Sequence, residues 1–197
     1  MSKIEVWFSF GSTYTFLTAS RLKKVIDEQS INFSLHPFSV RTVMKKMDNI
    51  PFPPSKKSKV DHMWRDIERR SEIYGIEKPK LPAPYPIKEL DLANRVALVG
   101  VNNGWCLDYL FLSYKNWFYD HIEAGSDENL KNTFENLGLD FEKIKKEANS
   151  DKIIDEYENQ TEKAYEIGVF GSPTFIYNNE VFWGDDRLED AIRWSKK

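Results

Sequence analysis

The N-terminal part of the chain carries two short runs in which apolar residues occupy every second position. Residues 4–8 form the first run and residues 31–35 the second. A period of two residues is typical of a β-strand with one buried face. Between the runs, residues 14–26 carry apolar side chains at helical spacing, and Ser12 or Thr13 can serve as the N-cap. We therefore expect a strand–helix–strand unit with a right-handed parallel crossover.

A second β-rich region lies near the C-terminal end. Two β-prone runs, residues 174–177 and 180–183, are separated by Asn178 and Asn179, which suit the positive φ angles of a tight hairpin. Pro173 precedes the first run, at a position where a strand tolerates a residue without a backbone N–H. We expect a β-hairpin that begins at this proline and leaves backbone exposed beside it.

The segment between these regions has helical periodicity. A proline-rich loop at residues 50–54 ends the strand pattern, and the chain then reads as helical to about residue 168. Asp127 and Asp140 are expected to cap two of these helices, and Asp185 or Asp186 is expected to cap the last one. The predicted apolar helix faces span residues 60–74, 90–101, 107–118, 153–164 and 188–194.

This order of elements is that of an α/β protein with a thioredoxin fold and a large all-helical insertion. We expect residues 1–40 and 169–197 to form the thioredoxin-like domain and residues 41–168 the helical insertion domain. In this topology, the turn after the first strand and the start of the third strand lie at the same end of adjacent strands. Ser12 should therefore face Ser172 and Pro173.

Composition and charge limit the kinds of partner that the protein can have. The 197 residues are 41% hydrophobic and 14% aromatic, enough for a full core. The net charge of −3 comes from mixed acidic and basic residues, which argues against nucleic acid or an anionic membrane as a partner. No apolar run approaches the roughly 18 residues of a membrane span, and charges near the start disfavour a signal peptide. We expect a soluble, cytoplasmic protein.

The cysteine count changes the chemistry expected at Ser12. Cys106 is the only cysteine, so an internal disulfide and a Cys-x-x-Cys redox pair are excluded. A thioredoxin-type redox enzyme places its attacking cysteine at the N-terminus of the first helix, where amides and the helix dipole stabilise a thiolate. Serine at this position can donate a hydrogen bond to the thiolate of a bound ligand. The site is thus suited to hold a thiol.

Simpler interpretations exist for most of these residues. Ser12 can be only an N-cap, Asp185 and Asp186 only helix-start residues, and Lys59 part of a solvated basic run. The remaining candidates also favour structural roles: Cys106 is expected to be a small buried hydrophobe, and no metal site is expected because the three histidines, His36, His62 and His121, lack ligand spacing.

Four segments together resemble the 2-hydroxychromene-2-carboxylate isomerases. They are residues 8–17, the stretch Asp48-Asn49-Ile50-Pro51, residues 65–76, and residues 168–188 with Gly171-Ser172-Pro173-Thr174 and Gly184-Asp185-Asp186-Arg187. Those enzymes belong with the kappa-class glutathione transferases in the DsbA-like branch of the thioredoxin fold. The likeness extends over essentially the whole chain. The sequence departs from the family pattern at Ser9, Thr13, Ser172 and Lys88.

The resemblance implies glutathione as the cofactor and gives each site residue a role. Ser12 would face the glutathione sulfur, and the backbone of Ser172, beside a cis Pro173, would pair with the cysteinyl part. An ammonium group favours a carboxylate, and a carboxylate favours a lysine. Accordingly, the two ends of the tripeptide would be bound by Asn49 and Lys59 at the glycyl end and by Asp185 and Asp186 at the γ-glutamyl end.

The resemblance also implies a reaction, a glutathione-dependent isomerisation of an aromatic 2-hydroxychromene-2-carboxylate-type substrate. The glutathione thiolate would add reversibly to a conjugated carbon, bond rotation would follow, and the thiolate would be expelled. The relatives further imply a homodimer. Two alternatives remain: a kappa-like glutathione transferase or peroxidase, and a non-catalytic thioredoxin-like domain that binds peptides along the edge beside Pro173.

Overall fold

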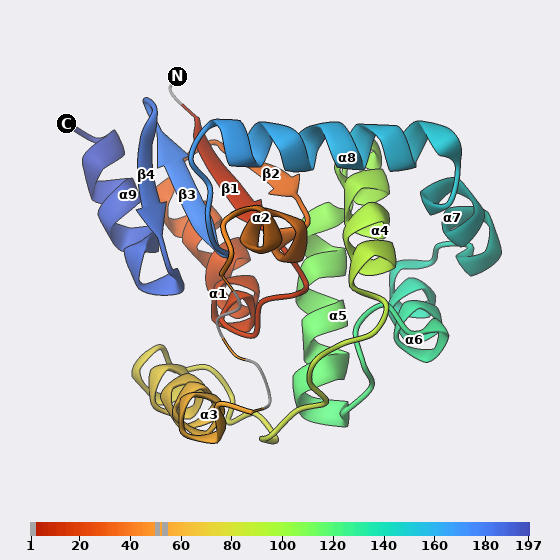
Figure 1. Ribbon diagram of the computed structural model, residues 1–197, viewed down its shortest axis with the longest axis horizontal. Coiled ribbons are helices and arrows are strands. Elements are labelled where there is room, and N and C mark those ends of the chain that lie inside the picture. The colour runs from red at the N-terminus through yellow and green to blue at the C-terminus, as the bar shows by residue number, and fades with distance from the viewer. Residues whose placement is uncertain (1–2, 50–51, 53–54) are drawn as a thin grey trace.

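The computed structural model describes residues 3–49, 52 and 55–197 (Figure 1). The predictions that concern the loop at residues 50–54, including Ile50 and Pro51 of the resemblance, therefore lie largely outside the described residues.

A four-stranded mixed sheet has the predicted connectivity. The strand order is β2-β1-β3-β4, with β1 parallel to β2 and antiparallel to β3. The hairpin between β3 and β4 turns at Asn178 and Asn179, whose φ angles are 48° and 65°, as predicted. The strands are β1 (Ile4–Phe8), β2 (Phe33–Pro37), β3 (Thr174–Tyr177) and β4 (Glu180–Trp183).

Helices surround the sheet and form the long insertion between β2 and β3, which confirms the predicted fold class. Figure 1 shows α3 below the strands and α8 extending from the sheet across α4. The sequence pattern did not predict α2. The helices are α1 (Thr15–Gln29), α2 (Val40–Lys46), α3 (Lys57–Ile73), α4 (Leu90–Asn103), α5 (Cys106–Asp120), α6 (Asp127–Leu137), α7 (Phe141–Ala148), α8 (Asp151–Glu166), the 3-10 helix η1 (Asp185–Arg187) and α9 (Leu188–Ser195).

The predicted cap of the first helix is wrong. The helix α1 begins at Thr15, and Tyr14 occupies the N-cap position without a capping hydrogen bond from its side chain. The Ser12 hydroxyl instead donates to the carbonyl oxygen of Ser172. Because residues 9–14 form a turn before the helix starts, the Ser12 side chain is available for contacts outside α1.

Two further cap predictions also fail. The cap of α6 is Ser126, whose hydroxyl accepts from the amide of Asn129 at 3.2 Å, one residue before the predicted Asp127. At the C-terminal end, η1 precedes α9, and neither helix has a side-chain cap; Asp185 and Asp186 instead bind arginines. The prediction for Asp140 is confirmed, since its carboxylate accepts from the amide of Lys143 at 2.9 Å.

The insertion packs on the thioredoxin elements through a shared apolar core. Phe16 of α1 stacks on Phe118 of α5 with 4.1 Å between ring centroids, and Phe10 stacks on Tyr114 at 4.9 Å. All four rings are almost completely buried. The division of the chain into domains 1–40 plus 169–197 and 41–168 stays a prediction.

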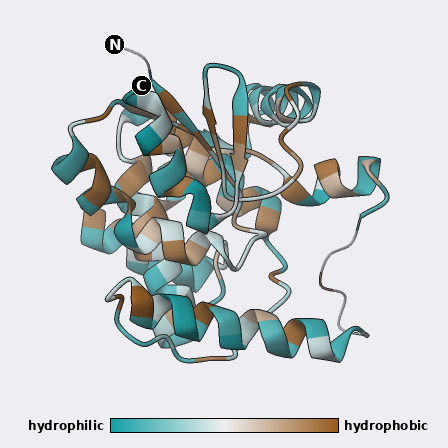
Figure 2. Cartoon of the chain, turned by 90° about the vertical axis from the view of Figure 1, so that its left-hand side faces the viewer, coloured by the Kyte–Doolittle hydropathy of each residue, from teal (hydrophilic) through white to brown (hydrophobic). Residues whose placement is uncertain are grey.

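Apolar residues recur along the helices among hydrophilic ones, as α3 at the bottom of Figure 2 illustrates. Met63 and Ile67 of this helix are fully buried, whereas Ile73 at its end is exposed. Within the described ranges, no helix combines the length and apolar character needed to cross a bilayer.

Candidate active site

The turn after β1 meets the residue that precedes β3. The Ser12 hydroxyl donates a hydrogen bond to the carbonyl oxygen of Ser172 over 2.6 Å, and the peptide bond between Ser172 and Pro173 is cis. This contact spans 160 residues of sequence and confirms that Ser12 faces Ser172. The antiparallel pairing of β1 with β3 produces it, because the end of one strand then lies beside the start of the other.

Ser172 is held in place by its own side chain. Its hydroxyl accepts from the amide of Ser9 at 2.8 Å and lies 2.9 Å from the hydroxyl of Thr15. Ser9 and Ser172, two of the departures from the family pattern, therefore contact each other. Since the Ser172 side chain is buried and satisfied, its main-chain groups have a fixed position at the surface of the site.

Several backbone amides at this point have no partner among the described residues. None of the described hydrogen bonds uses the N–H groups of Thr13, Tyr14 or Ser172. The first two amides belong to the turn that leads into α1, where the helix dipole favours negative charge. The Ser12 hydroxyl, the amides of Thr13 and Tyr14 and the backbone of Ser172 thus lie together.

A cavity of about 890 Å³ opens at this point. Six of the seven predicted site residues line it. Pro173, the seventh, is buried and is not part of the lining; its carbonyl accepts from the amide of Gly184 at 2.9 Å. The basic residues in the lining outnumber the acidic ones, so the cavity suits an anionic ligand. The basic residues of the lining are Arg41, Lys45, Lys59, Arg70 and Arg187, and the acidic ones are Asp66, Asp185 and Asp186.

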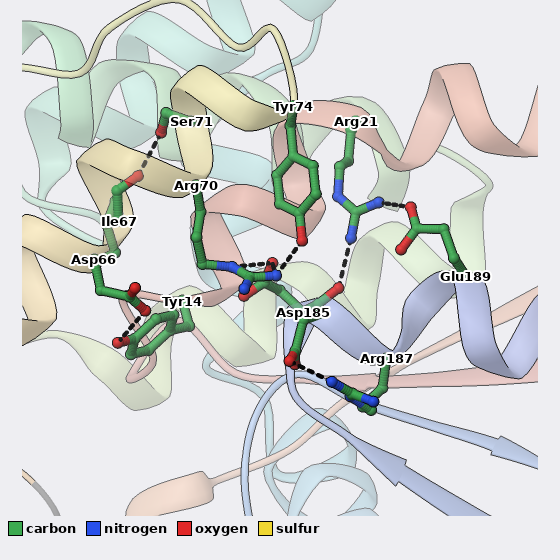
Figure 3. A network of polar contacts seen from close by, with 11 residues as sticks. Tyr14, Arg21, Asp66, Ile67, Arg70, Ser71, Tyr74, Asp185, Arg187 and Glu189 are labelled. Atoms are coloured by element: carbon green, nitrogen blue, oxygen red, sulfur yellow. Dashed lines mark hydrogen bonds and ion pairs between the residues drawn. The ribbon is translucent and has the colours of Figure 1, made fainter.

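Asp185 belongs to a network of charged side chains between α1, α3 and η1 (Figure 3). Its carboxylate is 3% exposed and accepts from Nε of Arg70 at 3.1 Å. Arg21 donates to the Asp185 carbonyl and also pairs with Glu189. Burial raises the pKa of the Asp185 carboxyl, and the charge of Arg70 offsets this only in part. Asp185 therefore contributes to the site mainly by holding the guanidinium of Arg70 in place.

Asp186 is the exposed member of the acidic pair. Its carboxylate accepts from Nη2 of Arg187 at 2.7 Å, and this hydrogen bond lowers the pKa of the carboxyl. It is therefore ionised at neutral pH and open to solvent from the cavity.

Two site residues of α3, Asp66 and Arg70, were not predicted as such from the sequence. Asp66 and Arg70, one helical turn apart, both line the cavity. Asp66 accepts from the hydroxyl of Tyr14 at 3.0 Å, and burial followed by the charge of Asp66 raises the pKa of this phenol. The spacing of an aspartate and an arginine four residues apart was the available signal, but it is also common on solvated helices.

The predicted residues for the glycyl end, Asn49 and Lys59, also line the cavity. Asn49 follows α2, and its amide donates to the carbonyl of Met44 at 2.9 Å. Nζ of Lys59, in the first turn of α3, lies 5.5 Å from the ring centroid of Phe52. Lys57 does not line the cavity and pairs with Asp61. Of the basic run, only Lys59 reaches the site.

Cys106 has no part in this arrangement. It is buried in the first turn of α5, and burial raises the pKa of its thiol. It behaves as the small buried hydrophobe expected from the sequence, which leaves the cavity lining without a thiol of its own.

The fold and the site define a thioredoxin-like protein in which Ser12, in the turn before α1, replaces the cysteine of a redox enzyme. A family model described as a DSBA-like thioredoxin domain matches residues 3–192, and the chain belongs to this family.

Comparison with individual proteins supports the resemblance drawn from sequence segments. The chain is 25% identical to a 2-hydroxychromene-2-carboxylate isomerase of Pseudomonas putida, over 94% of this chain and 90% of the relative. A solved structure of a 2-hydroxychromene-2-carboxylate isomerase superposes with a TM-score of 0.86 at 22% identity, covering 98% of this chain and 94% of that one. The cytosolic disulfide reductase DsbM of Pseudomonas aeruginosa, solved with GSH, gives a TM-score of 0.65 at 13% identity, covering 98% and 96%.

Proposed function

We propose that the protein is a glutathione-dependent isomerase of an aromatic, 2-hydroxychromene-2-carboxylate-type substrate. The observation that carries the proposal is the pairing of Ser12 with Ser172 at the mouth of a large cavity, in a chain whose single cysteine is buried elsewhere. The name of the relatives supports the type of substrate.

The chemistry of the cavity lining suits each part of glutathione. The Ser172 backbone offers a carbonyl and an unpaired amide to a peptide, and Ser12 lies beside them. At one end of the cavity, Asp186 and Asp66 offer carboxylates to an ammonium group, and Arg70 offers a guanidinium to a carboxylate. Lys59 offers a charge to the glycyl carboxylate at the other end.

Bound glutathione would supply a thiol sulfur as the nucleophile, which this chain lacks in the cavity. The chain's contribution begins with the Ser12 proton, which lies on the Ser172 carbonyl in the present structure. A bound peptide whose N–H donates to this carbonyl would share the acceptor with Ser12. The Ser12 hydroxyl could then turn and donate its hydrogen bond to a neighbouring acceptor. The unpaired amides of Thr13 and Tyr14 would stabilise negative charge on the sulfur of a bound thiol.

Two features of the surrounding residues suit them to position the reactants. Arg70 is held by Asp185 and can therefore bind a carboxylate without a large loss of side-chain entropy. The apolar part of the lining, from Val40, Met44 and Tyr85, suits an aromatic ring. The Ser12 hydroxyl would donate its hydrogen bond to negative charge on the sulfur of a bound thiol, both before the thiol adds and after it leaves.

The test compares Ser12→Ala with Ser20→Ala in the presence of glutathione. Loss of the Ser12 hydroxyl should raise the pKa of the bound thiol by about 1 unit and lower turnover about 10- to 100-fold. The Ser20 hydroxyl donates to the Phe16 carbonyl within α1 and does not line the cavity, so its removal is the matched control. The pKa is read from the ultraviolet absorbance of the thiolate during a pH titration.

An unchanged thiol pKa in Ser12→Ala would contradict the role of the hydroxyl. Consumption of one glutathione per product would favour a kappa-like transferase or peroxidase. Absence of glutathione binding together with capture of an extended peptide would favour a thioredoxin-like binding domain.

A further inference from the structure

The helix α2 presents a mixed face to the cavity. Val40 and Met44 form its apolar stripe, and Arg41 and Lys45 form a basic stripe beside it, each pair one helical turn apart. We call these four residues the α2 face. Neither the helix nor this face was predicted from the sequence, and none of the four residues belongs to the proposed glutathione contacts.

The α2 face lies next to Ser12. The amide of Val40 donates to the Ser9 hydroxyl at 3.4 Å, and the same hydroxyl accepts from the amide of Gly11 at 3.3 Å. A Cβ atom on Gly11 would lie 3.0 Å from Cγ1 of Val40, so this part of α2 packs directly against the turn that carries Ser12. A ligand on the α2 face would therefore be close to the proposed position of the sulfur.

Buried polar contacts fix α2 in this position. The Ser39 hydroxyl caps the helix by accepting from the amide of Thr42, and it donates to Asp91 of α4 at 3.3 Å. Asp91 also accepts from the hydroxyl of Tyr157 at 2.9 Å, and the amide of Ser39 donates to Thr161 of α8 at 3.0 Å. Two long helices thus hold the start of α2, which makes its cavity face preorganised.

The opposite side of this region is aromatic. Tyr85 and Pro86 line the cavity, and Tyr85 packs edge-on against Trp64 with 5.9 Å between ring centroids. Nη2 of Arg41 donates to the carbonyl of Ile87 at 3.3 Å, which joins α2 to this segment. The guanidinium of Arg41 therefore lies close to the segment that carries Tyr85.

The charges on the α2 face are not compensated. Neither Arg41 nor Lys45 forms an ion pair with any described residue, whereas Lys46, the next residue on the helix, pairs with Glu162. Lys46 does not line the cavity. On this helix, the basic residue outside the cavity is paired with a carboxylate, and the two basic residues that line the cavity are not. Arg41 and Lys45 can therefore each bind an anion.

We propose that the α2 face binds the aromatic carboxylate substrate, with Arg41 as the specificity-determining residue. The guanidinium binds the carboxylate in a charge-assisted contact, Lys45 adds a second charge, and the ring packs between Met44 and Tyr85. This inference rests on the proposed function for the identity of the substrate and adds the place where its carboxylate is bound.

The test measures two affinities by isothermal titration calorimetry in the wild-type protein, Arg41→Met and Lys46→Met. The probes are trans-cinnamate, an aromatic carboxylate, and glutathione. Arg41→Met should weaken cinnamate binding about tenfold or more, because it removes a hydrogen bond between charged groups. The affinity for glutathione should change by less than about twofold, which is less than the effect of losing one contact. Lys46→Met should change neither affinity.

Arg41→Lys keeps the positive charge but loses the guanidinium. Its affinity for cinnamate should therefore lie between that of the wild-type protein and that of Arg41→Met. Cinnamyl alcohol, which lacks the carboxylate, should bind the wild-type protein and Arg41→Met equally. Three results would overturn the inference: no binding of cinnamate to the wild-type protein, equal cinnamate affinity in Arg41→Met, or an equal loss of glutathione affinity in that variant. Failure of glutathione to bind the wild-type protein, with cinnamate binding still dependent on Arg41, would refute only the proposed function.

Discussion

Ser12 and Ser172 determine the chemistry at the end of the sheet. A cysteine at the first position would present a thiolate to the cavity, whereas the serine hydroxyl presents a proton that a carbonyl now accepts. This contact could be predicted from the sequence because strand pairing alone places the two residues together. The residues Arg41, Asp66 and Arg70 could not, because their positions depend on how α2 and α3 pack, which periodicity does not specify.

Gly171 permits the close approach of an aromatic residue at the rim of the cavity. A Cβ atom at this position would lie 2.1 Å from Nε1 of Trp183, a side chain that lines the cavity and is 53% exposed. Gly171→Ala should therefore displace the indole and weaken glutathione binding about three- to tenfold, about 1 kcal/mol. Calorimetry measures the change.

The control for this prediction is a double-mutant cycle with Trp183→Ala. If the indole is the cause, Gly171→Ala should have almost no effect on binding once Trp183 is removed. An equal loss in both backgrounds would show that the alanine acts on the backbone instead.

Asp185 is expected to matter for stability as well as for the orientation of Arg70. Asp185→Asn removes the buried partner of a guanidinium whose side chain is 21% exposed, and should lower the free energy of unfolding by about 2–4 kcal/mol. Asp186→Asn changes an exposed carboxylate and should cost less than about 0.5 kcal/mol. Urea unfolding followed by circular dichroism gives both values, and similar costs would contradict the assigned network.

At the scale of the element, the sequence predicts the long helices better than their starts. Apolar faces on α3, α4, α5 and α8 repeat over several turns and identify these helices clearly. The seven-residue helix α2 is too short for such a repeat, and it follows β2 almost directly. Caps were misplaced at Asp127, Asp185 and Asp186 because aspartate serves equally well as a cap, a first-turn residue or a partner of arginine.

The cap of α2 allows a prediction about the whole helix. Ser39→Ala removes both the cap and the contact with Asp91, and should lower the free energy of unfolding by about 1–2 kcal/mol. Ser126→Ala removes the cap of α6, outside the cavity, at a similar cost in stability of about 1 kcal/mol.

The two cap variants differ in their expected effect on the cavity. Only Ser39→Ala should weaken the binding of trans-cinnamate, because only α2 carries the α2 face. Titration of both variants with cinnamate checks this, and an equal affinity in the two would mean that α2 keeps its position without its cap.

At the scale of the whole molecule, the order of the elements was sufficient to predict the thioredoxin fold. A parallel strand pair followed by a C-terminal hairpin with a proline at the start of its first strand predicts this fold, and the sheet order β2-β1-β3-β4 agrees with it. The placement of the insertion was not predictable in the same way. It depends on rings such as Phe16 and Phe118, which meet across a core shared by segments about 100 residues apart.

In the proposed function, glutathione acts in the cavity as a catalyst that is regenerated in each turnover. The most direct measurement follows the conversion of a 2-hydroxychromene-2-carboxylate by proton NMR with glutathione well below the substrate concentration, while the free thiol is titrated. We predict many turnovers per glutathione, a constant thiol concentration and no conversion above background without glutathione. Equal rates with and without glutathione, or the loss of one thiol per product, would contradict the claim.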